Sequence, residues 1–413
     1  MKIILVHNRY KLPGGEDVVF EQELQLLLRC GHDVQTYCRS NWEVDSYSGV
    51  KQLALAQRMI WASDTYRDFS DLLCRQKPDL VHVHNVWYMI SPSIYVSCFQ
   101  AGVPVVQTVH NYRLLCPSGQ FFRDGKTCEE CVDHGLQRSV LHACYNGSRP
   151  ATAALALALA VHRLMRTWST TIDTYITLSQ FSRSKILKAG IPAKSVFVKP
   201  NFLYPDPGPA TDERRYALFI GRLTGNRVST ILKAWTQLNH GLELLIIGDG
   251  PEASGLQEEA AFHRLSTVRF QGHQSREEVI TCLRRAAFLI FSSQWYENFP
   301  MTIIEAFACG VPVICSRMGA MQEIVEDGRT GLHFIPGNAD DLAAKVDWAW
   351  NHPERMQEMG REARKEYESK YTAEKNYPLL MKIYQHAIAG RSSKLVPDQE
   401  LAEPESSSRL HWS

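Results

Sequence analysis

Short apolar runs alternate with helix-like patterns along the first half of the chain. Lys2–Val6 is typical of a buried strand, and apolar residues then recur at helical spacing between Val18 and Leu28, before Gly31 ends the helix. Further strands are predicted at Asp33–Tyr37, Leu80–Val83, Val103–Val109 and Ile172–Leu178. Strands separated by helices indicate parallel β-α units with both faces of the sheet covered.

This alternation breaks at residues 199–210, KPNFLYPDPGPA, which are too rich in proline for a helix or a central strand. A second series of predicted strands follows at Ala217–Ile220, Leu242–Ile247, Val268–Phe270, Ala287–Phe291, Val311–Cys315 and Gly331–Ile335. We therefore predict an α/β protein made of two doubly wound, Rossmann-like domains that face each other across a cleft.

The predicted boundaries follow from these breaks in the pattern. They are a first domain at 1–200, a hinge at 201–213, a second domain at 214–372, a C-terminal helix at 373–390 and a disordered tail at 391–413. We expect the C-terminal helix to pack back on the first domain.

Composition narrows the class of protein. The 413 residues carry 45 Lys+Arg against 44 Asp+Glu, a net charge of +1, so charge favours no nucleic acid partner. The first residues lack the pattern of a signal peptide, and no apolar run is long enough to span a bilayer. Eleven cysteines without such a signal favour a reducing compartment. The expected location is cytoplasmic.

One apolar helix is predicted at Ala151–Trp168, with Arg163 and Arg166 near its end. Its evenly apolar, alanine-rich surface favours a helix buried against the first sheet. The alternative is a helix that rests on the inner face of a membrane, near a lipid-linked substrate.

The sharpest chemical signal lies in the second half. A strand runs into a loop carrying Glu297, Pro300 suits the first turn of a helix, and Glu305 lies within that helix. The unpaired N–H groups of such a helix start can hold a phosphate. Glu297 can accept hydrogen bonds from sugar hydroxyls, and Glu305 suits a ribose diol. The alternative is that Glu297 offsets the helix dipole and Glu305 is a surface residue.

Residues 292–313 resemble the E-x₇-E region of the retaining family-4 glycosyltransferases (glycosyl transferases group 1), which have the GT-B fold. Order and spacing also match at FIGRL (219–223), LIIGDGPE (245–252), VRFQGH (268–273) and GAMQEIVEDGRTGLHF (319–334). The resemblance implies transfer of a sugar from a UDP- or GDP-sugar to a saccharide or lipid-linked acceptor, in polysaccharide or glycoconjugate biosynthesis.

The resemblance also implies roles for individual residues. Arg222 would contact the donor diphosphate, Glu305 the ribose, and Glu297 the donor sugar, together with the backbone of Asn298 and Phe299. The nucleotide would be bordered by Gly221, Gly248, Asp249, Gly250 and the turn Arg269–Gly272. Such enzymes need no metal for catalysis, because cations and helix termini stabilise the leaving diphosphate.

In the first half, Gly14 and Gly15 follow the first strand, where glycines let the backbone approach a ligand closely. The alternative is a purely structural turn, whereas the family resemblance places this loop opposite the diphosphate. His110 ends a strand, and the resemblance implies that it contacts the donor sugar without acting as a base. His84 and Asn85 end another strand and are expected to face the acceptor.

One departure from the family pattern concerns the phosphate loop. The pattern G-R-L-x₃-K-G is replaced by GRLTGNRV (221–228), so Arg227 falls at the spacing of the lysine and the following glycine is absent. Arg227 is expected to take over the role of the lysine. The alternative is an altered loop with reduced activity.

The resemblance implies retention through front-face attack, in which the leaving phosphate oxygen takes the acceptor proton and positioning and charge stabilisation carry the catalysis. Two other functions stay open: a nucleotide-sugar 2-epimerase and a catalytically weak nucleotide-sugar-binding protein. A NAD-dependent oxidoreductase is disfavoured, because neither half opens with a dinucleotide fingerprint.

Four cysteines form a second candidate site. Cys116, Cys128, Cys131 and Cys144 make a C-x₁₁-C-x₂-C-x₁₂-C pattern within a loop-like segment. A structural zinc would stabilise such a loop, which has little core of its own. Buried free thiols or a redox-labile pair are the alternatives.

Overall fold

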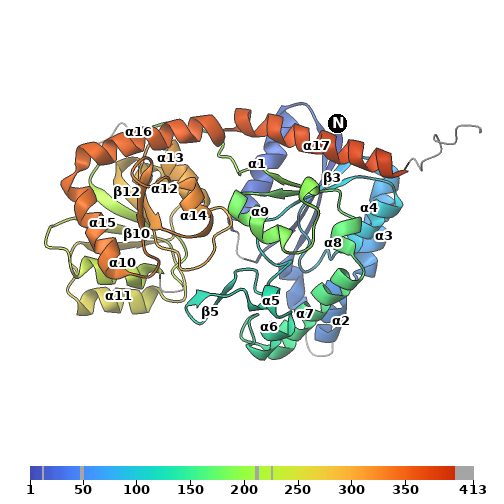
Figure 1. Cartoon of the computed structure of the whole chain (residues 1–413), viewed down its shortest axis with the longest axis horizontal. Coiled ribbons are helices and arrows are strands. Elements are labelled where there is room, and N and C mark those ends of the chain that lie inside the picture. The colour runs from blue at the N-terminus through green and yellow to red at the C-terminus, as the bar shows by residue number, and fades with distance from the viewer. Residues whose placement is uncertain (12–13, 47–50, 210–213, 225–226, 396–413) are drawn as a thin grey trace, which may run out of the picture.

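The computed structural model describes residues 1–11, 14–46, 51–209, 214–224 and 227–395. Its two halves each contain a parallel six-stranded sheet flanked by helices (Figure 1), which confirms the predicted fold class. Part of the expected hinge, 210–213, and most of the expected tail, 396–413, lie outside the described residues.

The first sheet has the order β2-β1-β3-β4-β7-β8, with every neighbouring pair parallel. Its strands are β1 Lys2–Arg9, β2 Asp33–Ser40, β3 Leu80–Asn85, β4 Val105–Thr108, β7 Thr174–Thr177 and β8 Val196–Val198. Its helices are α1 Gly15–Arg29, α2 Lys51–Ile60, α3 Ser63–Gln76, α4 Ser93–Gln100, α7 Arg149–Leu164, α8 Thr167–Thr170 and α9 Gln180–Leu187, with short 3₁₀ turns at Asn41–Ser46 and Ala193–Ser195.

The interior strand β1 is buried on both faces. Ile3 and Leu5 join one apolar cluster, and Ile4 and Val6 join another on the opposite face. Successive strand residues point to opposite faces, so an unbroken apolar run is what a strand covered by helices on both sides requires.

The second sheet has the order β11-β10-β9-β12-β13-β14, also parallel throughout. Its strands are β9 Tyr216–Ile220, β10 Glu243–Ile247, β11 Val268–Gly272, β12 Ala286–Phe291, β13 Val313–Ser316 and β14 Gly331–Phe334. Its helices are α10 Arg227–Trp235, α11 Ala253–Phe262, α12 Arg276–Arg285, α13 Met301–Ala308, α14 Gly319–Ile324, α15 Ala339–Asn351 and α16 Pro353–Lys370. The chain order reverses between β9 and β12, and open α/β sheets bind ligands at such a switch point.

The last helix, α17 Ala373–Leu395, continues from α16 and runs across to the first domain (Figure 1). Its residues Leu380, Ile383, Tyr384 and Ala387 are buried in one cluster with side chains of the first sheet and of α1. The first domain therefore completes its core with a segment from the far end of the chain.

Helix α7 contains most of the apolar segment 151–168. Leu155, Ala158 and Leu159 are fully buried in the first-domain core, whereas Leu157 and Leu164 are exposed. The helix is too short for a bilayer, and among the residues that the structure describes no helix combines the length and apolarity that a membrane crossing needs.

Candidate active site

Two loops of the second domain interlock at the switch point. Backbone bonds join Gly221 N to Ile247 O at 3.0 Å and Leu223 N to Asp249 O at 3.0 Å. A Cβ atom added at Gly248, which has φ +139°, would lie 1.9 Å from the carbonyl oxygen of Gly221. This close approach requires glycine. Gly250 is similarly restricted, because a Cβ added there would lie 2.4 Å from the carbonyl oxygen of Leu223.

The two arginines of the altered phosphate loop have different environments. Arg222 is exposed, just beyond β9. Arg227 begins α10, is 9% exposed, forms an ion pair with Glu297, and lies with its guanidinium carbon 3.8 Å from the ring centre of Trp295. Burial lowers the pKa of Arg227 while Glu297 opposes that shift. Its buried Nε has no hydrogen-bond partner among the described residues.

The loop between β12 and α13 bridges the two domains. Ser293 Oγ lies 3.2 Å from Glu297 Oε1, which places this carboxylate between Ser293 and Arg227. Asn298 Nδ2 donates to the carbonyl oxygen of Val109 at 2.6 Å, and Ser182 Oγ donates to Asn298 Oδ1. Glu297 is thereby held close to the strand end that carries His110.

Phe299 and Glu305 have different environments. The ring of Phe299 packs against Tyr371 at 5.9 Å between ring centres, and touches the apolar clusters of both domains. Glu305 lies on α13, half-buried. Burial raises its pKa to about 7, with a smaller opposing effect from Arg276. Glu305 is therefore only partly ionised near neutral pH.

His110 lies just beyond β4, half-buried, with its Nε2 2.9 Å from Nδ1 of His84. Burial holds the pKa of His110 well below its usual range, so the ring is neutral at pH 7. His84 and Asn85 are 2% and 3% exposed and bonded inside the domain, Asn85 Nδ2 to the carbonyl oxygen of Asn8. Both residues line one pocket together with His110, so their contact with the acceptor stays a prediction.

The glycine loop opens the first helix. Gly14 is the N-cap of α1, and its N–H donates to Asp17 Oδ2 at 2.9 Å. A Cβ added at Gly14 or Gly15 would meet nothing within 4 Å, so this loop borders open space, where a ligand can approach the backbone.

Polar side chains that the sequence patterns did not single out lie beside this loop. Tyr10 OH donates to Glu16 Oε2 at 3.3 Å, and Asn111 Nδ2 donates to Tyr10 OH at 3.4 Å. Burial, and then Asp17, raise the pKa of Glu16 to about 8. Arg113, 8% exposed, donates to Tyr88 OH at 2.9 Å. Single residues spread over three loops leave no spacing signal by which a sequence could reveal them.

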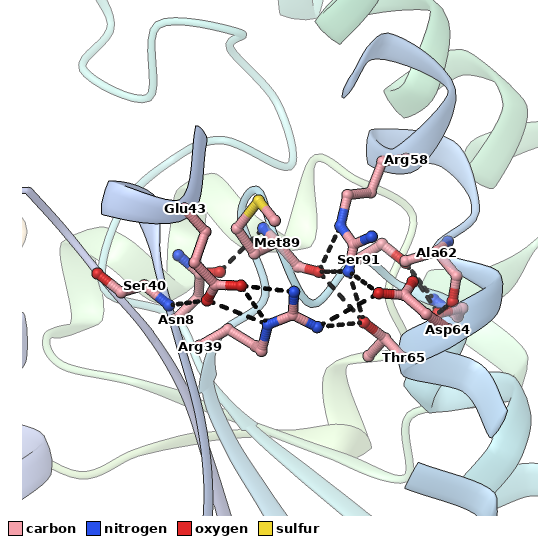
Figure 2. A network of polar contacts seen from close by, with 11 residues as sticks. Asn8, Arg39, Ser40, Glu43, Arg58, Ala62, Asp64, Thr65, Met89 and Ser91 are labelled. Atoms are coloured by element: carbon pink, nitrogen blue, oxygen red, sulfur yellow. Dashed lines mark hydrogen bonds and ion pairs between the residues drawn. The ribbon is translucent and has the colours of Figure 1, made fainter. Parts of the chain in front are cut away.

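A polar network fixes the loop that carries Tyr88. Figure 2 shows Arg58 donating to the carbonyl oxygen of Met89 at 2.8 and 2.9 Å, and Asn8 Oδ1 accepting from Met89 N at 2.9 Å. Arg39 lies between Glu43 and Asp64 and ties the end of β2 to α3. The loop after β3 is therefore held rigidly against the first sheet.

The four cysteines lie near one another but are not tightly assembled. Cys116 and Cys131 are buried, and Cys128 and Cys144 are partly exposed, around a hairpin of β5 Phe122–Arg123 and β6 Lys126–Thr127 and the short helices α5 Glu130–Asp133 and α6 Gln137–Leu141. Burial, and then the other three thiols, raise the pKa of Cys131 to about 12. No three of these described sulfur atoms lie within 4.8 Å of one another.

Comparisons with known proteins cover both domains. A family model for the glycosyl transferase 4-like domain matches residues 14–201, and one for glycosyl transferases group 1 matches residues 204–366. A glycogen synthase of Mycobacterium tuberculosis is 27% identical over 311 residues, 71% of this chain and 66% of that protein. The D-rhamnosyltransferase WbpZ of Pseudomonas aeruginosa is 29% identical over 161 residues, 38% of this chain and 42% of that protein.

Solved structures share the fold. Sucrose-phosphate synthase from Thermosynechococcus elongatus has a TM-score of 0.70 at 17% identity, covering 94% of this chain and 99% of its own. Anabaena HepE in complex with UDP has a TM-score of 0.67 at 16% identity, covering 95% of this chain and 100% of its own.

Proposed function

Since the chain belongs to the glycosyl transferases group 1, with the GT-B fold, we propose that it transfers a sugar with retention from a UDP- or GDP-sugar to a saccharide or lipid-linked acceptor. The observation that carries this proposal is the hydrogen bond from Asn298 to the carbonyl oxygen of Val109. It holds the paired Arg227 and Glu297 of one domain near His110 of the other, so that one ligand can contact both domains.

In this proposal, side chains and backbone groups of the protein stabilise the charge that develops on the leaving diphosphate. Arg222 and Arg227 neutralise the diphosphate, whose negative charge grows as the glycosidic bond breaks. The first N–H groups of α13 add to this stabilisation. Glu297, oriented by its ion pair with Arg227, accepts hydrogen bonds from sugar hydroxyls, and neutral His110 contacts the same sugar. The acceptor proton passes to the leaving phosphate oxygen, so no protein nucleophile is used.

The first donor to test is UDP-glucose, because structures of HepE hold UDP and UDP-glucose. A thermal-shift screen over nucleotide-sugars reports binding, since a ligand at 100 times its Kd adds about 2.7 kcal/mol of stability. Turnover is then followed by release of the nucleotide diphosphate with candidate acceptors. An epimer formed from the donor alone would favour a 2-epimerase, and binding without turnover would favour a binding protein.

Nucleotide-sugar affinity is expected to fall at acid pH. Ribose hydroxyls donate more strongly to Glu305 when it is ionised than when it is protonated, and its pKa is raised to about 7. Binding therefore selects the deprotonated form, and the affinity present at higher pH is lost as the pH falls through about 7. Calorimetry with UDP-glucose should give a Kd about tenfold weaker at about pH 6 than at about pH 8.

Glu305→Gln is the control for this pH dependence. The amide cannot ionise, so the variant should bind more weakly at every pH and show a flat profile over the same range. A wild-type profile that is equally flat would remove Glu305 from the nucleotide site.

The acceptor side fits hydroxyl-bearing substrates. The carboxyl, phenol and guanidinium groups of Glu16, Tyr10 and Arg113 lie next to the open glycine loop.

Two exposed leucines on α7 support peripheral contact with a membrane that carries a lipid-linked acceptor. Leu157 is 57% exposed and Leu164 is 86% exposed.

We expect one structural zinc per chain at Cys116, Cys128, Cys131 and Cys144. Zinc would need the loop to draw its sulfurs closer than they lie here, since four thiolates share a tetrahedron at about 2.3 Å from the metal. Native mass spectrometry should show one zinc ion that is lost when Cys128 and Cys131 become serine. A stable preparation without metal, made in the presence of zinc, would identify the cysteines as ordinary thiols.

A further inference from the structure

A line of buried polar side chains lies behind His110. His110 Nε2 is 2.9 Å from His84 Nδ1, and His84 Nε2 is 3.1 Å from Glu23 Oε2. The other carboxylate oxygen of Glu23 is 3.0 Å from Lys199 Nζ. Glu23, Lys199 and His84 are 0%, 1% and 2% exposed. The line connects α1, β3 and the residue after β8 to the cleft, and no step of the proposed reaction uses its inner members.

The charges along this line are defined by its neighbours. Burial tends to raise the pKa of Glu23, but the Lys199 ammonium, with a smaller effect from His84, outweighs it and holds this pKa well below its usual range. Glu23 is therefore a carboxylate that pairs with the Lys199 ammonium. Burial lowers the pKa of His82 to about 3 and holds that of His110 well below its usual range, so both rings are neutral.

These charges decide which ring nitrogen carries each proton. The Glu23 carboxylate has no proton to donate, and its Oε2 lies 3.1 Å from His84 Nε2, although not in hydrogen-bond geometry. Its negative charge favours the hydrogen on that nitrogen. The charge of Glu23 is already balanced by Lys199. A His84 ring that carries its hydrogen on Nε2 has a lone pair on Nδ1, and this lone pair accepts from His110 Nε2–H. His110 is left with a lone pair on Nδ1, which makes no hydrogen bond within the described part of the chain.

We propose that Glu23 and His84 are positioning residues that fix His110 in its Nε2–H tautomer, so that Nδ1 accepts a hydrogen bond from a hydroxyl group of the bound donor sugar. The link to sugar rests on the proposed function, whereas the tautomer itself does not. In the opposite tautomer His110 would present an N–H donor, and a hydroxyl would have to turn its oxygen toward the ring.

The same region is a poor metal site. Glu23, His82 and His84 offer ligand atoms within 4.8 Å of one another. However, both ring nitrogens of His82 are engaged, by Tyr384 OH at 2.8 Å and Thr108 Oγ1 at 2.7 Å. The Lys199 ammonium already neutralises the carboxylate, so a cation would meet a like charge.

Glu23→Gln tests the proposal because it should reverse the direction of hydrogen-bond donation from residue 23 through His84 to His110. Lys199 only donates, so the glutamine turns its carbonyl oxygen to Lys199 and its NH₂ group to His84 Nε2. His84 must then carry its proton on Nδ1 and donate to His110 Nε2, which moves the His110 proton to Nδ1. Nitrogen-15 NMR of labelled histidines separates the two tautomers directly. We expect His110 as Nε2–H in the wild type and as Nδ1–H in Glu23→Gln.

The controls come from the same domain and the same spectrum. Asp17→Asn removes a carboxylate 2.9 Å from Nε2 of His7, and should leave the His110 tautomer unchanged. The signals of His333, which contacts the carbonyl oxygen of Val325, report whether the fold is intact. Wild-type His110 as Nδ1–H, or no change of tautomer in folded Glu23→Gln, would overturn the proposal.

A second variant covers the case that Glu23→Gln does not fold. Glu23→Leu with Lys199→Met removes both buried charges together, which proteins often tolerate. His84 then has no charged partner, and His110 should populate both tautomers. A single Nε2–H tautomer in this variant would equally overturn the proposal.

The effect on binding is measured separately. If Nδ1 of His110 accepts from the sugar, Glu23→Gln should weaken UDP-glucose binding about tenfold and leave UDP binding unchanged, because UDP lacks the sugar. Equal loss of both ligands would indicate a structural role only, and would overturn the proposal. If the tautomers are as expected but the wild type transfers no sugar, the proposed function is wrong and the tautomer proposal stands.

Discussion

Arg227→Ala is expected to slow sugar transfer about a hundredfold or more, the usual cost of losing one charge-assisted contact in a transition state. Arg227 is buried, lies over the ring of Trp295 and pairs with Glu297, so it is already oriented before the diphosphate arrives. Its contact strengthens as the leaving group gains charge, so kcat should fall more than donor affinity. The measurement is steady-state turnover at saturating donor.

Two further variants show whether a loss of activity comes from the missing positive charge at position 227. Arg227→Lys restores the residue type of the family pattern and should retain substantial activity, while the exposed Arg222→Ala serves as a positive control for loss. If Arg227→Ala turns over at the wild-type rate while Arg222→Ala is inactive, the site works with one arginine. Arg227 would then serve only to orient Glu297.

Gly248→Ala should destabilise the second domain by about 3 kcal/mol or more. The added Cβ would lie 1.9 Å from the carbonyl oxygen of Gly221, and alanine is also strained at the φ of +139° found here. Backbone cannot move aside as a flexible side chain does, so the two loops must separate. The melting temperature should drop by about 6–12 °C, and nucleotide affinity should fall with it.

Gly255 provides the matched control seven residues further along. It lies inside α11 and a Cβ there would meet nothing within 4 Å, so Gly255→Ala should leave the melting temperature unchanged or slightly raised. If both variants melt at the same temperature, the close approach at Gly248 does not limit stability.

The strands and their parallel arrangement could be predicted from the sequence. Buried strands such as β1 are unbroken apolar runs, which can be recognised without knowing the tertiary contacts. The E-x₇-E loop was also predictable, since Glu297, Asn298 and Glu305 lie in one continuous motif.

Contacts between distant segments could not be predicted in the same way. Glu23, His84 and Lys199 are 61 or more residues apart in the sequence. Each is an unremarkable polar residue until the fold places Glu23 3.1 Å from His84 and 3.0 Å from Lys199. The near-complete burial of His84 could not be predicted either, because the end of a strand in sequence does not tell how deep its last side chain lies. Similarly, only the structure pairs Arg227 with Glu297 across 70 residues.

The long final helix has a consequence for the order in which the protein can fold during synthesis. Leu380, Tyr384 and Ala387 of α17 complete the apolar cluster on one face of the first sheet. The last strand of that sheet, β8, has left the ribosome long before these residues are translated. At a synthesis rate of about 5–20 residues per second, the interval between the synthesis of β8 and that of α17 is on the order of tens of seconds. During that interval the nascent first domain exposes the part of this cluster that α17 later covers, so a chaperone that binds apolar surface can recognise it.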